Sequence, residues 1–434
     1  MISPTSVATY DGAIVVKLSA LPSLATLAHA WRSLEQRAKF SFFVSWSWIG
    51  PWLSSLPDNI RAQLLLAMRG DRVVGMAVIV DAPIRGLPMP FGRAAWLHTT
   101  GQPGLDGIAI EHNGFLVDAE DAHAVEARML AFMLDEARPW RRVIMPLMGG
   151  PKSPSTVEAS DRFASKQQRK PCWTIDLQKA RSHANGLLGL LSAKARANLR
   201  RTLRACEALG DLQVDEARDL AVAQQYLASL LKFHERRWRA LATPSAFAAP
   251  FTQRFHAALL GEAFERGEVQ VLRVRAGARD VGYLYSFVHD GRVSFYQSGF
   301  DYGLLDSRFS PGLATLLLGI DYNARRGHAV FDFLGGSVKY KATLATDCEE
   351  LLSIVVDRRS APYQAESWMR SHLLPIVRRA SGNSPDTRKW LMKWVRRIAV
   401  VLSLPLLLLC LDACAVPQEE DRPQRKVGLL PLAA

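Results

Sequence analysis

The sequence is poor in cysteine, and the cysteines that it has follow no pattern. In a chain of 434 residues there are five, at Cys172, Cys206, Cys348, Cys410 and Cys414, with no CxxC pair and no regular spacing. Such scatter argues against a disulfide framework and against a zinc site, and it fits a reducing compartment. We therefore expect neither disulfides nor a bound metal.

The N-terminus also lacks the features of a secretory signal. The opening residues, MISPTSVATYDGAIVVKL, contain no basic n-region and no long apolar core. A signal peptide needs both. We expect a cytoplasmic protein whose 49% hydrophobic and 22% charged composition is that of a soluble globular chain. A chain of this length is too long for one ordinary core, which predicts two domains.

Acidic residues are scarce in two segments of a chain whose net charge is +13. Residues 162–204 hold eleven Lys and Arg against one acid, Asp176, and residues 377–397 hold seven against Asp386. Such segments suit anionic partners, namely the phosphates of a cofactor, a nucleic acid or an anionic membrane face. A simple solvated surface is the alternative for each segment taken alone.

The chain resembles itself at a fixed distance. Three pairs of segments recur in the same order: 31–34 with 238–241 and 70–75 with 277–282, both offset by 207, and 142–150 with 328–336, offset by 186. Three matches in one order predict a duplicated domain. Each copy reads as a helical region, a hairpin or meander, one amphipathic helix and a further strand.

That element order predicts an α+β fold in which helices flank a mixed sheet. The polar stretch GGPKSPSTVEASDRFASKQQRKP predicts a boundary between the copies. We expect an N-terminal domain over 1–165, a C-terminal domain over 166–360, a basic helical tail over 361–397, and a hydrophobic segment with a polar end over 398–434.

A strongly basic helix is predicted over residues 191–209, capped by Ser192 and closed by Gly210. Apolar residues fill one arc of its helical wheel. The other arc holds five basic residues: Lys194, Arg196, Arg200, Arg201 and Arg204. The helix is either a surface helix docked on the core or a binding face for phosphate or another anionic partner. The absence of acids before Glu207 favours the second interpretation.

Two titratable residues stand out as candidates for catalysis. His234 lies on a predicted helix over 227–241, four residues before Trp238, and is either a packed histidine or a general base. Asp332 lies near the end of an alternating strand, where site residues often sit in α/β folds. Its carboxylate needs a partner if it is buried, and we expect Lys341 or His234 to supply it. An Asp332–Lys341 pair with a purely structural role is the alternative.

A second helix is predicted to begin directly after a strand and a turn. Ser310 suits the N-cap, Pro311 the first helical position, and Gly312 allows a ligand close to the backbone. The free backbone N–H groups at the positive end of such a helix form an anion site. Every capped helix has such groups, so the signal is weak by itself.

These motifs, taken in order, resemble a known family. The order is a basic SxKxRxNLRR helix, FHERRW, YQSGFD, a helix opened by SPG, and DFLGG followed by YK. It is similar to the CelD/BcsL-type acetyltransferases of the GNAT (Gcn5-related N-acetyltransferase) superfamily, which have two tandem GNAT-like domains and are akin to the FemAB peptidyltransferases. The resemblance covers about residues 25–360.

The resemblance implies an acyl-CoA donor, such as acetyl-CoA, whose pyrophosphate lies at the helix start. That position corresponds to Arg308, Ser310, Pro311, Gly312 and Leu313 in this sequence. The superfamily fingerprint, Arg/Gln-x-x-Gly-x-Gly/Ala, is one residue longer here. This departure matches the FemAB-like families, whose donor is an aminoacyl-tRNA.

The resemblance also implies residue roles in the second copy. Tyr340 occupies the place of the tyrosine that protonates the leaving thiolate in many GNAT enzymes. We expect His234 or Asp332 to act as general base and Lys341 to hold the aspartate or a phosphate. The first copy has Pro146 in place of Asp332, so we interpret it as a scaffold or as part of the acceptor cleft.

The leading hypothesis is therefore an acyltransferase that moves an acyl group from acyl-CoA to an amine or hydroxyl of a cell-envelope or exopolysaccharide precursor. One alternative is aminoacyl transfer from tRNA, with the basic segment as the tRNA-binding surface. The other is a non-catalytic scaffold that binds an acidic glycan or a synthase partner.

The C-terminal segment carries an unusual apolar run, Ile398–Leu411, preceded by basic residues and followed by Leu411-Asp412-Ala413-Cys414. Fourteen residues are short for a membrane span and typical of a signal core, and the sequence after them resembles a lipoprotein signal. Three interpretations remain open: membrane association at the periphery of the inner membrane, a joined lipoprotein frame, or an amphipathic packing segment.

Overall fold

The structure is a computed structural model that describes residues 12–84, 92–149, 160–242, 245–336, 338–368 and residue 371. The basic segment 377–397, the apolar run 398–411, and both Cys410 and Cys414 lie outside these residues. Within the described ranges, none of the helices combines the length and apolar character that a membrane span requires. The three cysteines of the described residues are free thiols.

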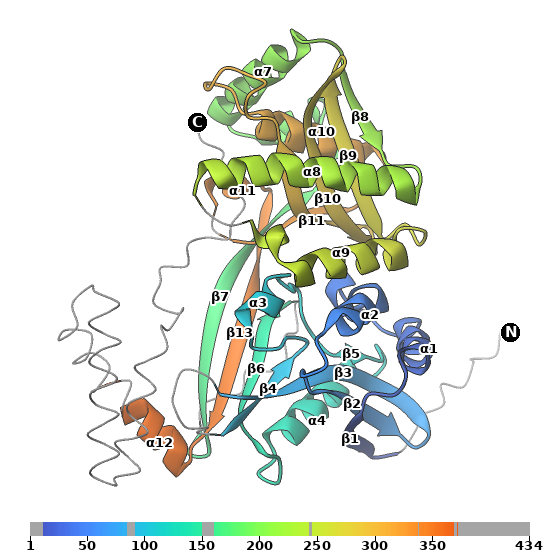
Figure 1. The fold of residues 1–434 in the computed structure, drawn as a ribbon, viewed down its shortest axis with the longest axis vertical. Helices are drawn as coiled ribbons and strands as arrows, with labels where there is room; N and C mark the ends of the chain where they lie inside the picture. The colour runs from blue at the N-terminus through green and yellow to red at the C-terminus, as the bar shows by residue number, and fades with distance from the viewer. Residues whose placement is uncertain are drawn as a thin grey trace, which may run out of the picture.

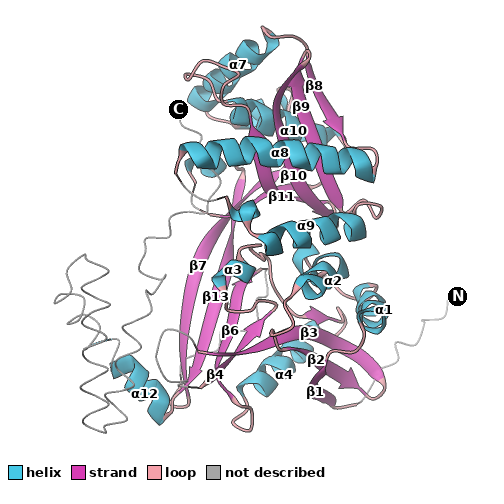
Figure 2. Ribbon diagram, viewed as in Figure 1, coloured by secondary structure: helices cyan, strands magenta, loops and turns pink. Residues whose placement is uncertain are grey.

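A mixed sheet of 13 strands runs through both units of the described residues, as Figure 2 shows. Its order is β1-β2-β3-β4-β6-β13-β7-β12-β11-β10-β9-β8, with β5 paired to β3. Only the pairs β4–β6 and β11–β12 are parallel among the described strands. Counted from either edge, the order passes through equivalent strands of the two copies, from β1 and β8 to β13 and β7. The sheet therefore divides into two units that β13 and β7 join.

The N-terminal unit (residues 14–149) forms the lower part of Figure 1. Its strands are β1 (Ile14–Ala20), β2 (Ala62–Arg69), β3 (Arg72–Pro83), β4 (Arg93–Leu97), β5 (Leu116–Val117) and β6 (Trp140–Met148). Its helices are α1 (Leu24–Glu35), α2 (Trp46–Ser55), α3 (Pro103–Asp106) and α4 (Ala122–Leu134).

The C-terminal unit (residues 177–344) forms the upper part of Figure 1. Its strands are β8 (Leu212–Glu216), β9 (Val269–Ala276), β10 (Arg279–His289), β11 (Arg292–Phe300) and β12 (Val330–Gly335). Its helices are α5 (Leu177–Ser182), α6 (Gly186–Leu190), α7 (Ala193–Glu207), α8 (Leu220–Ala240), α9 (Pro250–Ala263), α10 (Pro311–Arg325) and α11 (Lys339–Leu344).

The duplication read from the sequence is visible in local geometry. Gly70 and Gly277 turn the hairpins β2–β3 and β9–β10 with φ of 56° and 57°, a conformation in which glycine meets no Cβ penalty. The strand register then skips Val74 in β3 and Val281 in β10, so each copy carries a bulge. All these positions are 207 residues apart. The predicted α+β class, with a mixed sheet and two tandem units, is confirmed.

The two units exchange their last strands. β7 (Phe163–Asp176) follows the N-terminal unit in the chain but pairs with β12 of the C-terminal unit. β13 (Asp347–Arg358) follows the C-terminal unit but pairs with β6 of the N-terminal unit. β13 also pairs with β7 over its full length, from Phe163 to Thr174 of β7. The division at residues 165 and 166 stays a prediction, and it falls within β7. A last helix, α12 (Ala361–Trp368), follows β13.

An apolar core continues from one unit into the other. Phe42 of the N-terminal unit stacks on Phe287 of β10 at 4.4 Å between ring centroids. Trp48 of α2 meets Phe255 of α9 edge to face at 4.8 Å. Both pairs belong to one cluster of buried side chains. Buried aromatic pairs of this kind stabilise an interface beyond their burial alone, so the two units hold a fixed relative position.

Candidate functional site

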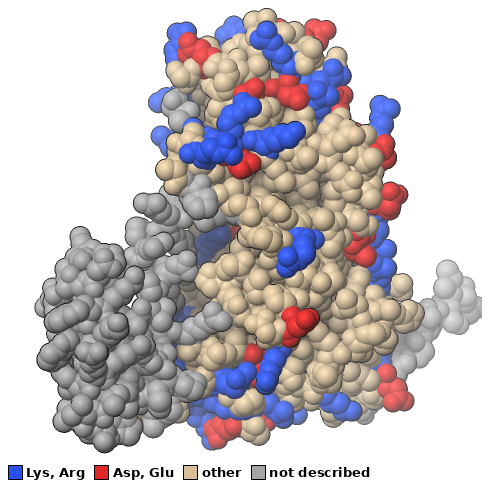
Figure 3. Space-filling model, viewed as in Figure 1, with Lys and Arg blue, Asp and Glu red and all other residues tan. Residues whose placement is uncertain are grey.

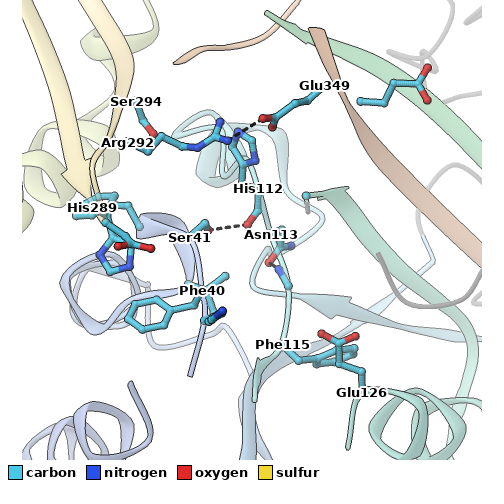
Figure 4. Close-up of a pocket in the computed structure, with 17 residues that line it drawn as sticks. Phe40, Ser41, His112, Asn113, Phe115, Glu126, His289, Arg292, Ser294 and Glu349 are labelled. Carbon is cyan, nitrogen blue, oxygen red and sulfur yellow. Dashed lines mark hydrogen bonds and ion pairs between the residues drawn. The ribbon is translucent and has the colours of Figure 1, made fainter. Parts of the chain in front are cut away.

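A cavity of about 610 Å³ lies between the two units. Figure 4 shows His112, Arg292 and Glu349 at one end of it, and Phe115 and Glu126 at the other. The N-terminal unit supplies one wall, and the ends of β10, β11 and β13 supply the other. Polar groups that converge on a cavity of this size are the usual mark of a ligand site.

Asp332 of β12 is completely buried beside this cavity and makes four hydrogen bonds. His112 Nε2 lies 2.8 Å from its Oδ2, and Arg292 Nη1 donates to the same oxygen at 2.7 Å. The backbone N–H of Leu334 and the thiol of Cys172 donate to Oδ1 at 2.7 and 3.2 Å. The expectation that a buried Asp332 must be paired is confirmed, and its partners come from both units.

The ionisation of this pair is set by opposing effects. Burial alone raises the pKa of Asp332, but the hydrogen bond from His112 and the charges of His112 and Arg292 outweigh it and hold that pKa well below the usual range. Burial lowers the pKa of His112, yet its hydrogen bond to Asp332 and the charge of Asp332 outweigh it, so the net shift is upward. Asp332 therefore stays ionised, and its charge stabilises the protonated form of the His112 imidazole.

The loop that carries His112 is anchored on one side to β12 and β7 and on the other to the N-terminal unit. Glu111 accepts a hydrogen bond from the backbone N–H of Gly335 and pairs with Lys170 of β7 at 3.0 Å. On the other side, the Ser41 hydroxyl donates to the carbonyl of His112 at 2.6 Å, as Figure 4 marks. These contacts hold the imidazole against Asp332 across the boundary between the units.

The backbone is strained where the two units meet. His112 and Leu334 adopt left-handed φ values of 44° and 60°, which residues with a Cβ rarely take. Such conformations cost about 1–3 kcal/mol each and cluster at functional sites. Gly149 leaves room for the imidazole, because a Cβ there would come within 2.6 Å of His112 Nδ1. That nitrogen has no hydrogen-bond partner among the described residues, and both His112 and Gly149 line the cavity.

Lys341 was an expected partner of Asp332, and this expectation is wrong. Its buried ammonium donates to three backbone carbonyls at the end of β12, those of Phe333, Leu334 and Gly335, at 2.7, 3.1 and 3.2 Å. Burial lowers the pKa of Lys341 to about 8. Because α11 begins beyond the end of β12, the lysine reaches the strand's carbonyls and braces the turn after Asp332.

His234 was the other expected partner of Asp332, and it too lies elsewhere. The indole N–H of Trp238 donates to His234 Nε2 at 2.7 Å, so Nδ1 carries the proton and donates to the Ser245 hydroxyl at 3.1 Å. Burial lowers the pKa of His234 to about 4. Both ring nitrogens are engaged within the C-terminal unit. His234 is therefore arranged as a packed histidine, the alternative to a general base.

Tyr340 and Asp332 lie on opposite faces of β12. Tyr340 of α11 packs edge to face on Phe333 at 5.9 Å and belongs to the buried cluster that also holds Phe331. Asp332, between these two phenylalanines, points to the other side. Burial raises the pKa of Tyr340 well above its usual value, so the phenol is neutral at physiological pH.

The residues expected to bind the donor gather at the start of α10. Ser310 is the N-cap and accepts from the backbone N–H of Leu313 at 3.4 Å, with Pro311 in the first turn. Pro311 and Gly312 are buried. Arg308, by contrast, is exposed and pairs with Asp306 at 3.0 Å. The predicted capping is confirmed, and the Arg308 guanidinium is already engaged by Asp306.

The thiol of Cys172 completes a compact group with His112 and Asp332. The donor atoms of the three residues lie within 4.8 Å of one another, a spacing that a metal ion could use. Arg292 places a cation 2.7 Å from the same carboxylate, which opposes a second cation there. Burial raises the pKa of the Cys172 thiol far above its usual value, so it acts as a hydrogen-bond donor to Asp332.

Glu126 of α4 is a carboxylate on the cavity wall with no hydrogen bond or ion pair to any described residue. Burial raises its pKa to about 7. A raised carboxyl pKa means that the folded protein holds the proton more tightly than the unfolded chain, so stability falls as pH rises towards 7. Glu126→Gln should therefore stabilise the protein by on the order of 1 kcal/mol near pH 8, after discounting for partial exposure, and by almost nothing near pH 5.

Urea unfolding of both proteins at these two pH values measures the effect. Glu136→Gln is the matched control, because Glu136 is exposed and 3.9 Å from its partner Arg162. It should change the free energy of unfolding by less than about 0.5 kcal/mol at either pH. Equal effects of Glu126→Gln at both pH values would show that Glu126 is not desolvated.

Sequence reasoning missed His112, Arg292 and Cys172, which are the actual partners of Asp332. One signal was present in the first copy: Glu111-His112-Asn113 interrupts an otherwise apolar run from Ile108 to Val117. Three polar residues inside such a run point to a local function. Nothing in the sequence linked that tripeptide to a strand 220 residues away.

Comparison with known proteins places part of the chain in context. Residues 193–342 match the family model of an acetyltransferase (GNAT) domain. No curated protein matches the chain. Three solved structures have a similar overall arrangement: FemX (10% identity, 78% of this chain and 96% of that chain, TM-score 0.48), L-PGS from Bacillus licheniformis (10%, 77% and 93%, 0.44), and a tandem GNAT protein from the clavulanic acid biosynthesis pathway (12%, 80% and 99%, 0.39).

The matched segment begins with α7 and ends just after Tyr340 and Lys341, so it contains α10, β12 and all the residues expected to bind the donor. The resemblance seen in the sequence is confirmed at the level of the superfamily. The match covers residues 193–342, and over this segment the chain is similar to GNAT-type acetyltransferase domains.

Proposed function

We propose that the protein is an acyltransferase that moves an acetyl or longer acyl group from acyl-CoA to an amine or hydroxyl of a cell-envelope or exopolysaccharide precursor. The observation that carries the proposal is the contact between His112 and Asp332. It joins an imidazole on the wall of a cavity to a buried aspartate inside a domain of the acetyltransferase type. The CelD/BcsL type is part of this proposal.

In this scheme His112 is the general base and Asp332 positions it. The acceptor lies in the cavity and attacks the thioester carbonyl, forming a C–N or C–O bond while the C–S bond breaks. His112 Nδ1 takes the proton from the acceptor, and the nearby anion of Asp332 stabilises the imidazolium. The departing thiolate regains a proton, so the net reaction moves one proton from acceptor to CoA; Tyr340 is the proposed donor if the thioester reaches the opposite face of β12, where its phenol lies.

The other candidate residues have supporting roles. Lys341 holds the carbonyls at the end of β12 and so fixes the turn that carries Leu334. His234 braces α8 against the loop at Ser245. The donor's phosphates bind at the backbone of the α10 start, which is formed by Ser310, Pro311, Gly312 and Leu313. Arg308 contributes to this site by releasing Asp306.

Alignment of the reactants supplies much of the rate in such a transfer. The N-terminal unit is then more than a scaffold, because it brings the base and one wall of the acceptor cavity. Isolated copies would each lack half of this arrangement. The cavity is open to both amines and hydroxyls, since either can give up a proton to a neutral imidazole.

Thermal unfolding with a panel of donors tests the proposal. Acetyl-CoA or a longer acyl-CoA at about a hundredfold its dissociation constant should stabilise the protein by about 2.7 kcal/mol, visible as a rise in Tm. Free CoA and dephospho-CoA are the controls for the headgroup. Protection by aminoacyl-tRNA in place of acyl-CoA would replace this donor with the FemAB-like one, and protection by neither would favour a non-catalytic scaffold.

A further inference from the structure

The exposed side of α7 carries a basic face, defined as Lys194, Arg196, Arg200, Arg201 and Arg204. All five lie on one side of the helix, and all but the half-buried Arg196 are exposed. The opposite side of α7 is buried through Leu199, Thr202 and Cys206. Figure 3 shows Lys and Arg side chains crowding the upper part of the molecule, where α7 lies in Figure 1.

None of the five basic residues forms an ion pair within the described part of the chain. Several exposed arginines elsewhere in the C-terminal unit are paired: Arg236 with Asp301, Arg239 with Glu235, and Arg325 with Asp321. The acids that could neutralise α7 are missing from the helix itself before Glu207. Arg196, Arg200 and Arg204 also stand four residues apart, a spacing at which like charges destabilise a helix. An external anion would relieve that repulsion.

A partly exposed leucine precedes the basic face in the chain. α6 has the sequence GLLGL, and its last residue, Leu190, is 36% exposed, one of four large hydrophobic side chains exposed in the described residues. Only Leu191 and Ser192 separate α6 from α7. A leucine beside a cluster of arginines is the combination by which peripheral proteins bind an anionic bilayer, with the charge at the headgroups and the apolar side chain below them.

We propose that α6 and α7 together dock on an anionic phospholipid bilayer. The nearest alternative by charge is a nucleic acid, but residues 186–207 contain no Phe, Tyr or Trp on which bases could stack. An exposed leucine adds to bilayer binding and adds nothing to phosphate contacts. This surface holds the C-terminal unit at the membrane. The proposal does not depend on the acyl transfer proposed above.

Cosedimentation of the full chain with vesicles tests the surface. The vesicles are phosphatidylcholine alone or with about one-third phosphatidylglycerol, at low and at high salt. Binding should require phosphatidylglycerol and weaken at high salt. Arg200→Gln with Arg201→Gln should weaken it about 30-fold, because each basic residue near such a surface contributes about 1 kcal/mol, or roughly a fivefold step. Leu190→Ala should weaken it several-fold further.

Arg236→Gln with Arg239→Gln is the matched control, since it removes the same charge from exposed positions of α8. It should change vesicle binding by no more than about twofold. Equal losses in the two double variants would overturn the proposal in favour of non-specific attraction. So would unchanged binding after the α7 substitutions, or binding of an RNA homopolymer that exceeds vesicle binding and is lost with them.

Discussion

Asp332→Asn should lower the free energy of unfolding by about 3–5 kcal/mol, the usual cost of breaking a buried charge pair from one side. The carboxylate is fully buried and neutralises Arg292 and His112 at once. An amide keeps the shape but leaves the protonated His112 without its anion and Arg292 with Glu349 alone. Urea unfolding followed by circular dichroism measures the change.

The size of this loss should depend on pH. The pKa of Asp332 is depressed, so its contribution is present above the ordinary aspartate range and is lost as pH falls through the folded value. The pKa of His112 is raised, so its contribution is present below about 6.5 and is lost as pH rises through the folded value. The destabilisation should therefore be larger near pH 5.5 than near pH 8.5.

Asp321→Asn is the matched control for this substitution. Asp321 pairs with Arg325 one turn away on the exposed side of α10, and such pairs are worth about 0.3–0.5 kcal/mol. If Asp332→Asn cost no more than this control, the buried network around Asp332 would contribute nothing beyond an exposed ion pair.

The fold was accessible to sequence reasoning because its signals are local or repeated. The turns at Gly70 and Gly277 need a left-handed backbone, so glycine recurs there at the same offset in both copies. The start of α10 at Ser310 and Pro311 was predictable because helix capping depends on residues that are adjacent in the chain. The strand exchange was not accessible, because the pairing of β7 with β12 has no local signature.

Only part of the candidate site could be predicted from the sequence. Asp332 stood out as an acid in an apolar strand, and burial required a partner for it. The expected partners, Lys341 and His234, both belong to the second copy. The true partner, His112, comes from the first copy, and it depends on how the two units dock. Docking is set by side-chain packing such as that of Phe42 on Phe287, which no sequence pattern specifies.

Gly149 and Gly335, the matching glycines near the ends of β6 and β12, have different structural roles. Gly149 gives the His112 ring its space in the first copy, whereas a Cβ at Gly335 in the second would come within 2.8 Å of the Lys170 side chain. The motif looked like a shared feature of the fold. Its two instances nevertheless leave room for different side chains, His112 in the first copy and Lys170 in the second.

His112→Gln should reduce kcat/KM by between about a hundredfold and ten-thousandfold, the range over which a positioned general base acts. Glutamine can still donate a hydrogen bond to Asp332, so the fold and Tm should change little, but it cannot accept a proton. The loss should fall on kcat more than on KM. With an acceptor that the wild type acylates, steady-state release of CoA measures both constants.

The pH profile separates a base from a merely structural histidine. In the wild type kcat/KM should rise with pH through the pKa of His112, which lies above the ordinary value of 6.5. Asp332→Asn should move that limb to lower pH, because the imidazolium loses its anion. His234→Gln is the matched control, since both nitrogens of His234 are already engaged, and its activity should stay within a few-fold of the wild type. Full activity in His112→Gln, or an equal loss in His234→Gln, would assign the base elsewhere.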